Sequence, residues 1–393
     1  MKAVIIGASS EALHTIQKAK EHGLYVVAID GNPEAEGLKA ADKAIVVDIS
    51  DEKSTIEAVE REQADFVLTV PIGRYLTTIG AVNDKLGLPG ISKEMAALCT
   101  DKLAFHKRLS AKGLRSCKCY EVKASNKEQM PLSYPAILKP RYGSGSRGIY
   151  MLSKEDELEV ALEAVAGEDY VFEECIAGEE YGVDGAVVDG CFHMVLLRKK
   201  ENTPPPARQA VGYFSVPEND GFRQRVSDYM SQVVQCLGLS ECLLHADIIR
   251  GQEGPFAIEV SARPSGHNLH NIFTPLCTGI DVAEEYIKYR LGKSYSFVPE
   301  QTKSMLIHYF DMEGTVKKVP KESEVLTVPE NQSEAGSDDV IALRLWKCNI
   351  KEGDVLAPVS DGHSVMGRGY FVLEGENQEK LQKASERIKS LFL

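Results

Sequence analysis

The sequence lacks the long hydrophobic runs and the export signal that membrane and secreted proteins carry. No segment approaches the ~20 apolar residues of a membrane span. The start MKAVIIG has one lysine and a short apolar run that ends at Gly7, which predicts a first strand and not a signal peptide. The nine cysteines stand at irregular spacing and form no disulfide framework. We therefore expect a cytoplasmic protein with free thiols.

Positive charge is also scarce. With 58 acidic and 45 basic residues, the formal net charge is -13 at pH 7. Proteins that bind nucleic acid usually carry a basic face. We therefore expect neither nucleic acid nor an anionic membrane as a partner.

Several catalytic signatures are missing as well. The chain has no convincing Ser-His-Asp or Cys-His arrangement, no Walker A ending and no GxGxxG. An oxidoreductase hypothesis would therefore depend on GASSEA and on Asp30 after the second apolar run, which is weak support. A reaction that needs no side-chain nucleophile fits these absences better.

What is present predicts more than one domain, because 393 residues exceed one ordinary core. Residues 1–100 alternate short β-branched runs with helical patterns, which indicates a parallel sheet with crossover helices. Ser92 and Thr100 look like helix N-caps. The predicted strands of this N-terminal α/β domain are 2–7, 25–30, 43–48 and 65–70.

The pattern then changes to a mixed α+β type. Residues 101–190 form a predicted lobe of strands with one helix, and residues 191–393 form a predicted C-terminal lobe with a closing subdomain. In the second lobe, 221–238 and 281–292 read as helices that stop at glycine. The overall fold class is thus α/β combined with α+β.

A glycine-rich loop lies between two predicted strands of the first lobe. The stretch KPRYGSGSRG, residues 139–148, can surround phosphate oxygens with backbone amides, and Lys139 can add a fixed positive charge. The glycines precede a strand, so they do not form a Rossmann turn. On this stretch alone, a plain surface hairpin explains the pattern equally well.

Carboxylates gather at two further places. In YVFEECIAGEEYGVDG, residues 170–185, a strand end could offer backbone groups to a base and a glutamate to a ribose, although a solvated strand edge would explain this stretch alone. Asp247 and Glu259 lie on two predicted strands joined by a turn, so both can point to one face. Two such acids indicate Mg²⁺. Arg263 follows closely and could hold a transferring phosphoryl group.

In this order the three stretches resemble the ATP-grasp superfamily. The resemblance covers nearly the whole chain, including the tail 353–384. It implies an N-terminal parallel α/β (pre-ATP-grasp) domain, a glycine-loop lobe over 101–190, and a C-terminal catalytic lobe over 191–393. It also implies that the glycine loop is a lid over the triphosphate of ATP.

The resemblance further implies a set of site residues. Lys139 and Arg263 would be catalytic, Lys102 would join Lys139 as a nucleotide lysine, and Glu180 would bind the ribose. Asp247, Glu259 and Ser261 would face Mg²⁺ (or Mn²⁺), with Ser261 where many members have asparagine. The remaining nucleotide residues would be Ser144, Gly145 and Ser146 in the lid and Glu173, Glu174, Cys175 and Ile176 in the adenine hinge.

The implied reaction is ATP-dependent joining of a small-molecule carboxylate and an amine through an acyl phosphate, with release of ADP and phosphate. The motifs most resemble the L-amino-acid-ligase branch. Substrate contacts would come from Ser265, Gly266 and His267, and from Arg208 and His193. His267 and His270 have metal-like spacing, but hydrogen bonding to substrate or core explains them better.

Two alternatives stay open. The first is suggested by EVSARPSGH, which also resembles the enzyme that carboxylates an aminoimidazole ribotide with bicarbonate. The second alternative is a module that binds a nucleotide without catalysis. A homodimer is possible, because dimers are common in families of this kind.

Overall fold

The computed structural model describes residues 1–122, 133–143, 147–204, 208–326, 341–360 and 362–393. The chain begins with a four-stranded parallel sheet of order β3-β2-β1-β4, in which Val4 of β1 lies opposite Val27 of β2. The predicted N-terminal α/β fold is confirmed. Its strands are β1 (Lys2–Ile6), β2 (Tyr25–Asp30), β3 (Lys43–Val46) and β4 (Phe66–Val67).

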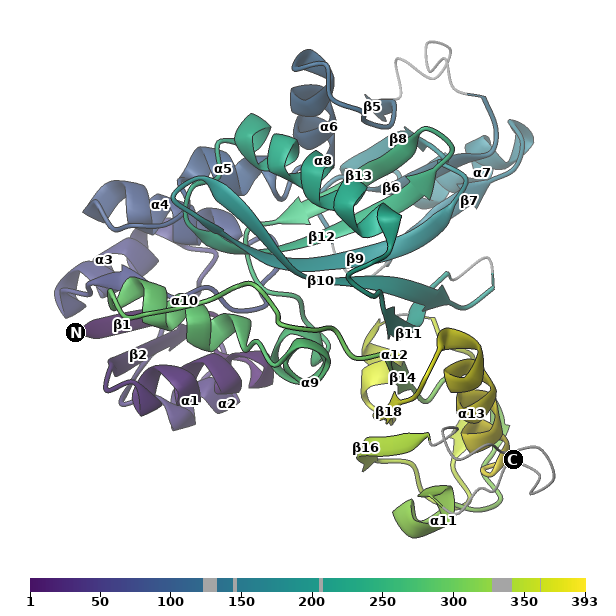
Figure 1. The fold of residues 1–393 in the computed structure, drawn as a ribbon. Helices are drawn as coiled ribbons and strands as arrows, with labels where there is room; N and C mark the ends of the chain where they lie inside the picture. The colour runs from purple at the N-terminus through teal and green to yellow at the C-terminus, as the bar shows by residue number, and fades with distance from the viewer. Residues whose placement is uncertain (123–132, 144–146, 205–207, 327–340, 361) are drawn as a thin grey trace.

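Helices cover both faces of this sheet because its strands are apolar on both sides. One of them comes from far along the chain. In Figure 1 the green helix α10 (Val282–Arg290) lies beside the purple first strands, and Val282 and Ile287 share a buried cluster with Ile5 and Ile16. The local helices are η1 (Ser10–Ala12), α1 (Leu13–Glu21), α2 (Glu36–Ala40), α3 (Glu52–Glu62) and α4 (Leu76–Leu86).

Two short helices lead out of this domain. Ser92 caps α5 (Lys93–Leu98) as predicted, because its hydroxyl accepts a hydrogen bond from the Met95 amide. The cap of α6 (Lys102–Ala111) is Asp101 and not Thr100. The Asp101 carboxylate accepts from the Ala104 amide, whereas the Thr100 hydroxyl turns back to the carbonyl of Ala96. The prediction for Thr100 was therefore wrong by one residue.

The glycine-loop lobe is a four-stranded antiparallel sheet of order β5-β8-β6-β7, covered by α7 (Asp156–Ala164). β6 and β7 pair as a hairpin, so the two strands predicted around the glycine loop are confirmed. The strands are β5 (Cys119–Glu121), β6 (Ala136–Pro140), β7 (Tyr150–Leu152) and β8 (Tyr170–Glu174).

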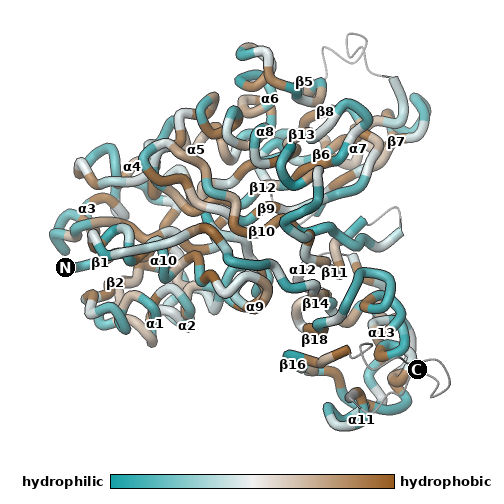
Figure 2. Tube along the Cα trace, in the orientation of Figure 1, coloured by the Kyte–Doolittle hydropathy of each residue, from teal (hydrophilic) through white to brown (hydrophobic). Residues whose placement is uncertain are grey.

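An eight-stranded sheet of order β13-β12-β9-β10-β11-β14-β18-β16 spans the rest of the chain. Figure 2 shows hydrophobic segments along its inner strands and hydrophilic ones on outer turns. The predicted boundary after residue 190 falls in the turn between β9 and β10, which pair along their length. The strands are β9 (Glu179–Val188), β10 (Cys191–Asn202), β11 (Ala210–Ser215), β12 (Cys242–Gly251), β13 (Gly254–Ser261), β14 (Met305–Tyr309), β16 (Ala342–Cys348) and β18 (Gly369–Glu374).

The helices on this sheet follow the predicted pattern. α8 (Gly221–Leu237) ends at Gly238 in the left-handed conformation, as the glycine stop predicted. Among the described residues, no helix is long and apolar enough to cross a membrane. The other elements are η3 (Leu269–Phe273), α9 (Thr274–Thr278), β15 (Gly314–Thr315), α11 (Glu322–Leu326), β17 (Val355–Leu356), α12 (Gly362–Met366) and α13 (Gln378–Ser390).

Candidate active site

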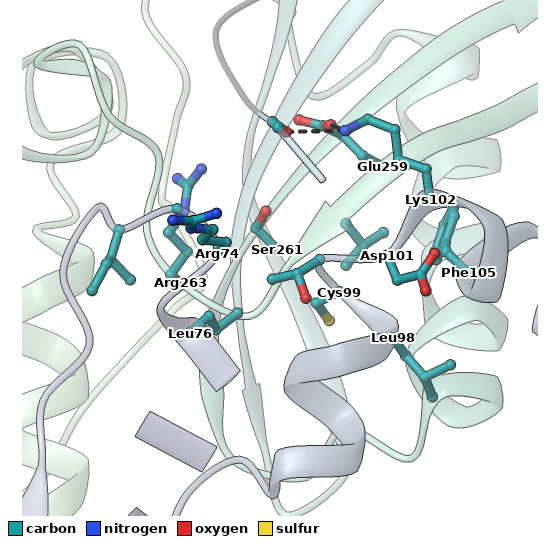
Figure 3. Close-up of a pocket in the computed structure, with 15 residues that line it drawn as sticks. Arg74, Leu76, Leu98, Cys99, Asp101, Lys102, Phe105, Glu259, Ser261 and Arg263 are labelled. Atoms are coloured by element: carbon teal, nitrogen blue, oxygen red, sulfur yellow. Dashed lines mark hydrogen bonds and ion pairs between the residues drawn. The ribbon is translucent and has the colours of Figure 1, made fainter. Parts of the chain in front are cut away.

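A cleft of about 520 Å³, partly open to solvent, lies where the N-terminal domain, α6, the glycine loop and β13 meet. Figure 3 shows its charged side chains, which come from segments far apart in the sequence. Four residues that the sequence singled out line it: Lys102, Glu259, Ser261 and Arg263. Two further polar contributors were missed, Asp101 and Arg74.

Lys102 stands at the first turn of α6 and reaches across the cleft. Its ammonium donates to the carbonyl of Gly143 at 3.0 Å and lies 3.8 Å from the Glu259 carboxylate. Burial lowers the pKa of Lys102, and Glu259 opposes that shift. A cation held by one loop carbonyl and one distant carboxylate can turn to a phosphate oxygen at low cost.

Lys139 lies deeper, in a closed pocket. Its ammonium is 2.6 Å from the Glu173 carboxylate, and both side chains are almost fully buried. Burial alone would raise the pKa of Glu173, but Lys139 and the neighbouring His106 lower it to about 2. The sequence placed Glu173 in the adenine hinge, whereas its carboxylate holds Lys139 in this structure.

The base of the glycine loop is fixed to α6. Arg141 donates two hydrogen bonds to the Asp101 carboxylate, at 2.8 and 2.6 Å, and a third to Glu121 at 3.2 Å. At the far end, a Cβ on Gly148 would lie 2.5 Å from the Tyr170 hydroxyl, and its φ is +68°. The lid residues Ser144, Gly145 and Ser146 lie outside the described residues, so their role stays a prediction.

The proposed hinge runs from the end of β8 into β9. The Glu174 carboxylate accepts from the Lys118 amide at 3.2 Å, and Cys175 and Ile176 are half-buried beyond it. A Cβ on Gly178 would lie 2.2 Å from the carbonyl oxygen of Arg250, so only glycine lets the hinge pass β12 this closely. Backbone groups of the hinge can thus form hydrogen bonds with an adenine base that lies beside this sheet.

Glu180 begins the part of β9 that follows the hinge. Its carboxylate forms an ion pair with Arg208, which has a positive φ of 45°. The side chain of Glu180 is only partly buried, as a ribose ligand would need to be. Arg208 belongs to the connection between β10 and β11.

The two predicted metal acids lie directly opposite each other on β12 and β13, so both point to the same face. Asp247 is 2.7 Å from the ammonium of Lys200, a residue that the sequence analysis missed. That ion pair lowers the pKa of Asp247 to about 2 against the effect of burial. Two ionised carboxylates on one face suit a hard cation such as Mg²⁺, and the Ser261 hydroxyl stands at the end of β13.

Arg263 follows directly after β13. Burial lowers its pKa, and the charge of Glu259 opposes that shift. Arg74, exposed on the loop after β4, lines the same cleft as shown in Figure 3. Two guanidinium groups in one cleft suit an anionic ligand.

The predicted substrate loop after Arg263 contacts the N-terminal domain. The amide of His267 donates to Glu11 at 2.9 Å, and Gly266 lies against the same carboxylate. Ser265 is buried, and its carbonyl bonds to the ring of fully buried His270. His270 is thus a core residue, as expected.

His193 lies near the start of β10, where its ring is 6.2 Å from that of Phe297. Among the described residues that line the cleft, none of the predicted substrate residues is present, neither His193 and Arg208 nor Ser265, Gly266 and His267. The assignment of His193 to the substrate therefore gains no support from its position.

Known proteins match the region that carries these groups. Residues 99–267 match the family model of the ATP-grasp domain. The matched segment includes the glycine loop, both lysines, the two predicted metal acids and Arg263, so the resemblance inferred from the sequence is confirmed.

The curated relatives of the chain are distant. Dapdiamide A synthase of Enterobacter agglomerans is 26% identical over 204 residues, which are 47% of this chain and 47% of that protein. The chain spans about half the length of the first curated relatives it matches, between 42% and 55%.

Solved structures share the fold over the full length. The L-amino acid ligase of Bacillus licheniformis has a TM-score of 0.79 at 19% identity and covers 99% of this chain and 97% of its own. The N5-carboxyaminoimidazole synthetase of Staphylococcus aureus, solved with ADP, has a TM-score of 0.73 at 16% identity and covers 99% and 96%. The ATP-grasp fold expected from the sequence is thus confirmed.

Proposed function

We propose that the chain is an ATP-dependent carboxylate–amine ligase that forms an amide bond, on amino acids or similar small molecules, and releases ADP and phosphate. The observation that carries this proposal is the meeting of Lys102, Glu259 and Arg263 in one cleft. The named neighbours, a dapdiamide synthase and an L-amino acid ligase, support the substrate class.

The two lysines bind the phosphates of ATP. The Glu173 carboxylate fixes the position of the Lys139 ammonium, and the Lys102 ammonium can leave Glu259 to bind a phosphate oxygen. The substrate carboxylate attacks the γ-phosphorus of ATP, and Arg263 offsets negative charge on the transferred phosphoryl group. The amine then attacks the acyl carbon and phosphate leaves. No side-chain nucleophile takes part.

Asp247 and Glu259, with Ser261 nearby, would hold Mg²⁺ (or Mn²⁺), which when bound supplies charge neutralisation at the phosphates. The glycine lid would exclude water from the acyl phosphate. We include in the proposal a cytoplasmic location and a homodimer. Sedimentation of the purified protein can test the homodimer.

The runner-up is bicarbonate-dependent carboxylation of an aminoimidazole ribotide. It is favoured by the fold of the Staphylococcus aureus synthetase and by Arg74 beside Arg263, a pair that fits a phosphate. The decisive experiment incubates the protein with ATP, Mg²⁺ and amino acids, singly and in pairs, and measures ADP and new amides by mass. ADP formed only with bicarbonate and the ribotide would select the runner-up, and AMP would overturn both.

A further inference from the structure

Three potential metal ligands gather beside the nucleotide lysine, and a fourth contacts one of them. They are His106 of α6, Cys117 in the following connection, Cys119 of β5 and Glu173 of β8. His106, Cys117 and Glu173 are buried, and one ligand atom from each lies within 4.8 Å of the other two. Cys119 lies directly opposite Glu173 in the sheet, so its thiol joins them on the same face.

These ligand atoms lie close enough to be drawn onto one ion. Cys117 Sγ lies 3.3 Å from His106 Nε2, 3.4 Å from His106 Nδ1 and 3.9 Å from Glu173 Oε2. Glu173 Oε1 lies 3.5 Å from His106 Nε2 and 3.6 Å from Cys119 Sγ. Because Cys117 Sγ is almost equally far from both ring nitrogens, the sulfur lies over the imidazole ring. The Cys117 or His106 side chain must therefore rotate before both bind one ion at the zinc distances of about 2.0–2.3 Å.

The imidazole of His106 is already oriented for such a role. Its Nδ1 lies 2.9 Å from the Ser116 hydroxyl. In the tautomer that donates from Nδ1 to Ser116, Nε2 keeps a free lone pair, and Glu173 Oε1 lies 3.5 Å from this nitrogen. A histidine ligand is commonly fixed by a hydrogen bond from its second nitrogen in this way.

Glu173 can serve this site without releasing Lys139. Its Oε2 holds the lysine ammonium at 2.6 Å, while Oε1 faces His106 and Cys119. A cation on Oε1 with two thiolates and a neutral imidazole would leave the group with one net negative charge, which favours the nearby ammonium. Metal and lysine are therefore electrostatically compatible.

Other uses of the two thiols explain them less well. Cys117 is buried, which hinders its use as a nucleophile or redox sensor. The proposed ligase chemistry employs no thiol. A bound metal would instead displace the thiol protons as it enters, and half-buried Cys119 gives it a route.

We propose that His106, Cys117, Cys119 and Glu173 form a site for a thiophilic divalent cation such as Zn²⁺, separate from the Mg²⁺ acids. The ion fixes the Glu173 carboxylate and thereby positions Lys139. The site does not depend on the proposed ligase activity, because its ligands and its spectroscopic signature exist without substrates.

Co²⁺ serves as the probe, added to the full-length protein in excess Mg²⁺. We expect a thiolate-to-cobalt charge-transfer band with the intense visible bands of tetrahedral cobalt, together with a Tm that rises with Co²⁺ concentration. Cys117→Ser and His106→Gln should each abolish the bands, and Cys119→Ser should weaken them. Cys191→Ser is the matched control, since Cys191 is an exposed thiol on another strand, and should leave the bands unchanged.

Absence of the bands in the native protein overturns the proposal, and so does their survival in Cys117→Ser or their loss in Cys191→Ser. If the cluster variants do not fold, X-ray absorption of the zinc-loaded native protein decides instead. Sulfur ligands at about 2.3 Å support the site, and a shell of oxygen and nitrogen alone refutes it. Failure of the ligase assay would leave these readouts unaffected.

Discussion

Two lysine–carboxylate pairs on opposite sides of the candidate nucleotide site differ in how they are held. Lys139 and Glu173 are 2.6 Å apart, with side chains 5% and 2% exposed. Lys102 and Glu259 are 3.8 Å apart, with side chains 11% and 29% exposed. The first pair is a fixed part of the fold, and the second is a loose contact in an open cleft.

The difference indicates that the first pair has a structural role and that the second pair can open when a ligand binds. A buried charge without its partner is costly, so the Lys139 pair must stay intact in every state of the protein. The Lys102 pair can open, because each partner has solvent and a cleft beside it. We infer that Lys139 provides a constant positive potential. When the ligands bind, Lys102 and Glu259 separate, so that Lys102 contacts a phosphate and Glu259 contacts the metal ion.

Glu173→Gln should produce the largest effect because it leaves the Lys139 ammonium buried without a counter-charge. We expect a loss of about 3–5 kcal/mol in the free energy of unfolding, the usual cost of breaking a buried pair. Urea unfolding measures it. Glu259→Gln is the matched control in the Lys102–Glu259 pair and should lower the free energy of unfolding by less than about 1 kcal/mol. Equal losses would contradict the distinction between the pairs.

Lys139→Ala should abolish ATP turnover, because it removes the positive charge proposed to face the phosphates. Because this substitution also leaves the buried Glu173 carboxylate without its ammonium partner, we expect a destabilised fold as well.

Glu259→Gln should abolish ADP formation while it leaves the fold almost unchanged. The amide keeps the shape of the side chain but removes the charge that a metal ion on β13 would need. Coupled measurement of ADP release, with circular dichroism for the fold, tests this. Turnover at the native rate would remove Glu259 from the proposed metal site.

Acid should remove the stability that the buried pair contributes. The pKa of Glu173 falls from the ordinary value near 4.5 to about 2. A depressed carboxyl pKa contributes stability that is complete above the unfolded value and is lost as pH falls through the folded value. The native protein should thus lose roughly 3 kcal/mol between about pH 5 and pH 2 from this group. In Glu173→Gln that portion of the pH dependence should vanish, as thermal unfolding at several pH values would reveal.

The sequence predicted the parts of this site that lie close together along the chain. Asp247 and Glu259 could be placed on one face because alternation along two strands and a short turn determine their register. Lys139 was singled out by its place beside the glycine loop, and Lys102 by the resemblance to the ATP-grasp superfamily. Their different surroundings could not be foreseen, since Glu173, His106 and Gly143 reach them only through tertiary packing. Lys200 was missed for the same reason, because it meets Asp247 across an intervening strand, β9.

Arg74→Ala should have the smallest effect, on substrate affinity alone. Arg74 is exposed at the rim of the cleft, and among the described residues it forms no ion pair with a carboxylate. It differs in this from Lys102 and Lys139, which each lie beside a glutamate. We expect KM for an anionic substrate to rise about tenfold, equal to ~1.4 kcal/mol, with kcat nearly unchanged. Arg61→Ala, an exposed arginine on α3 that contacts Glu57, is the control and should change neither constant. A fall in kcat with unchanged KM would place Arg74 in the chemical step, and no effect would mean that the anionic group is bound by Arg263 without it.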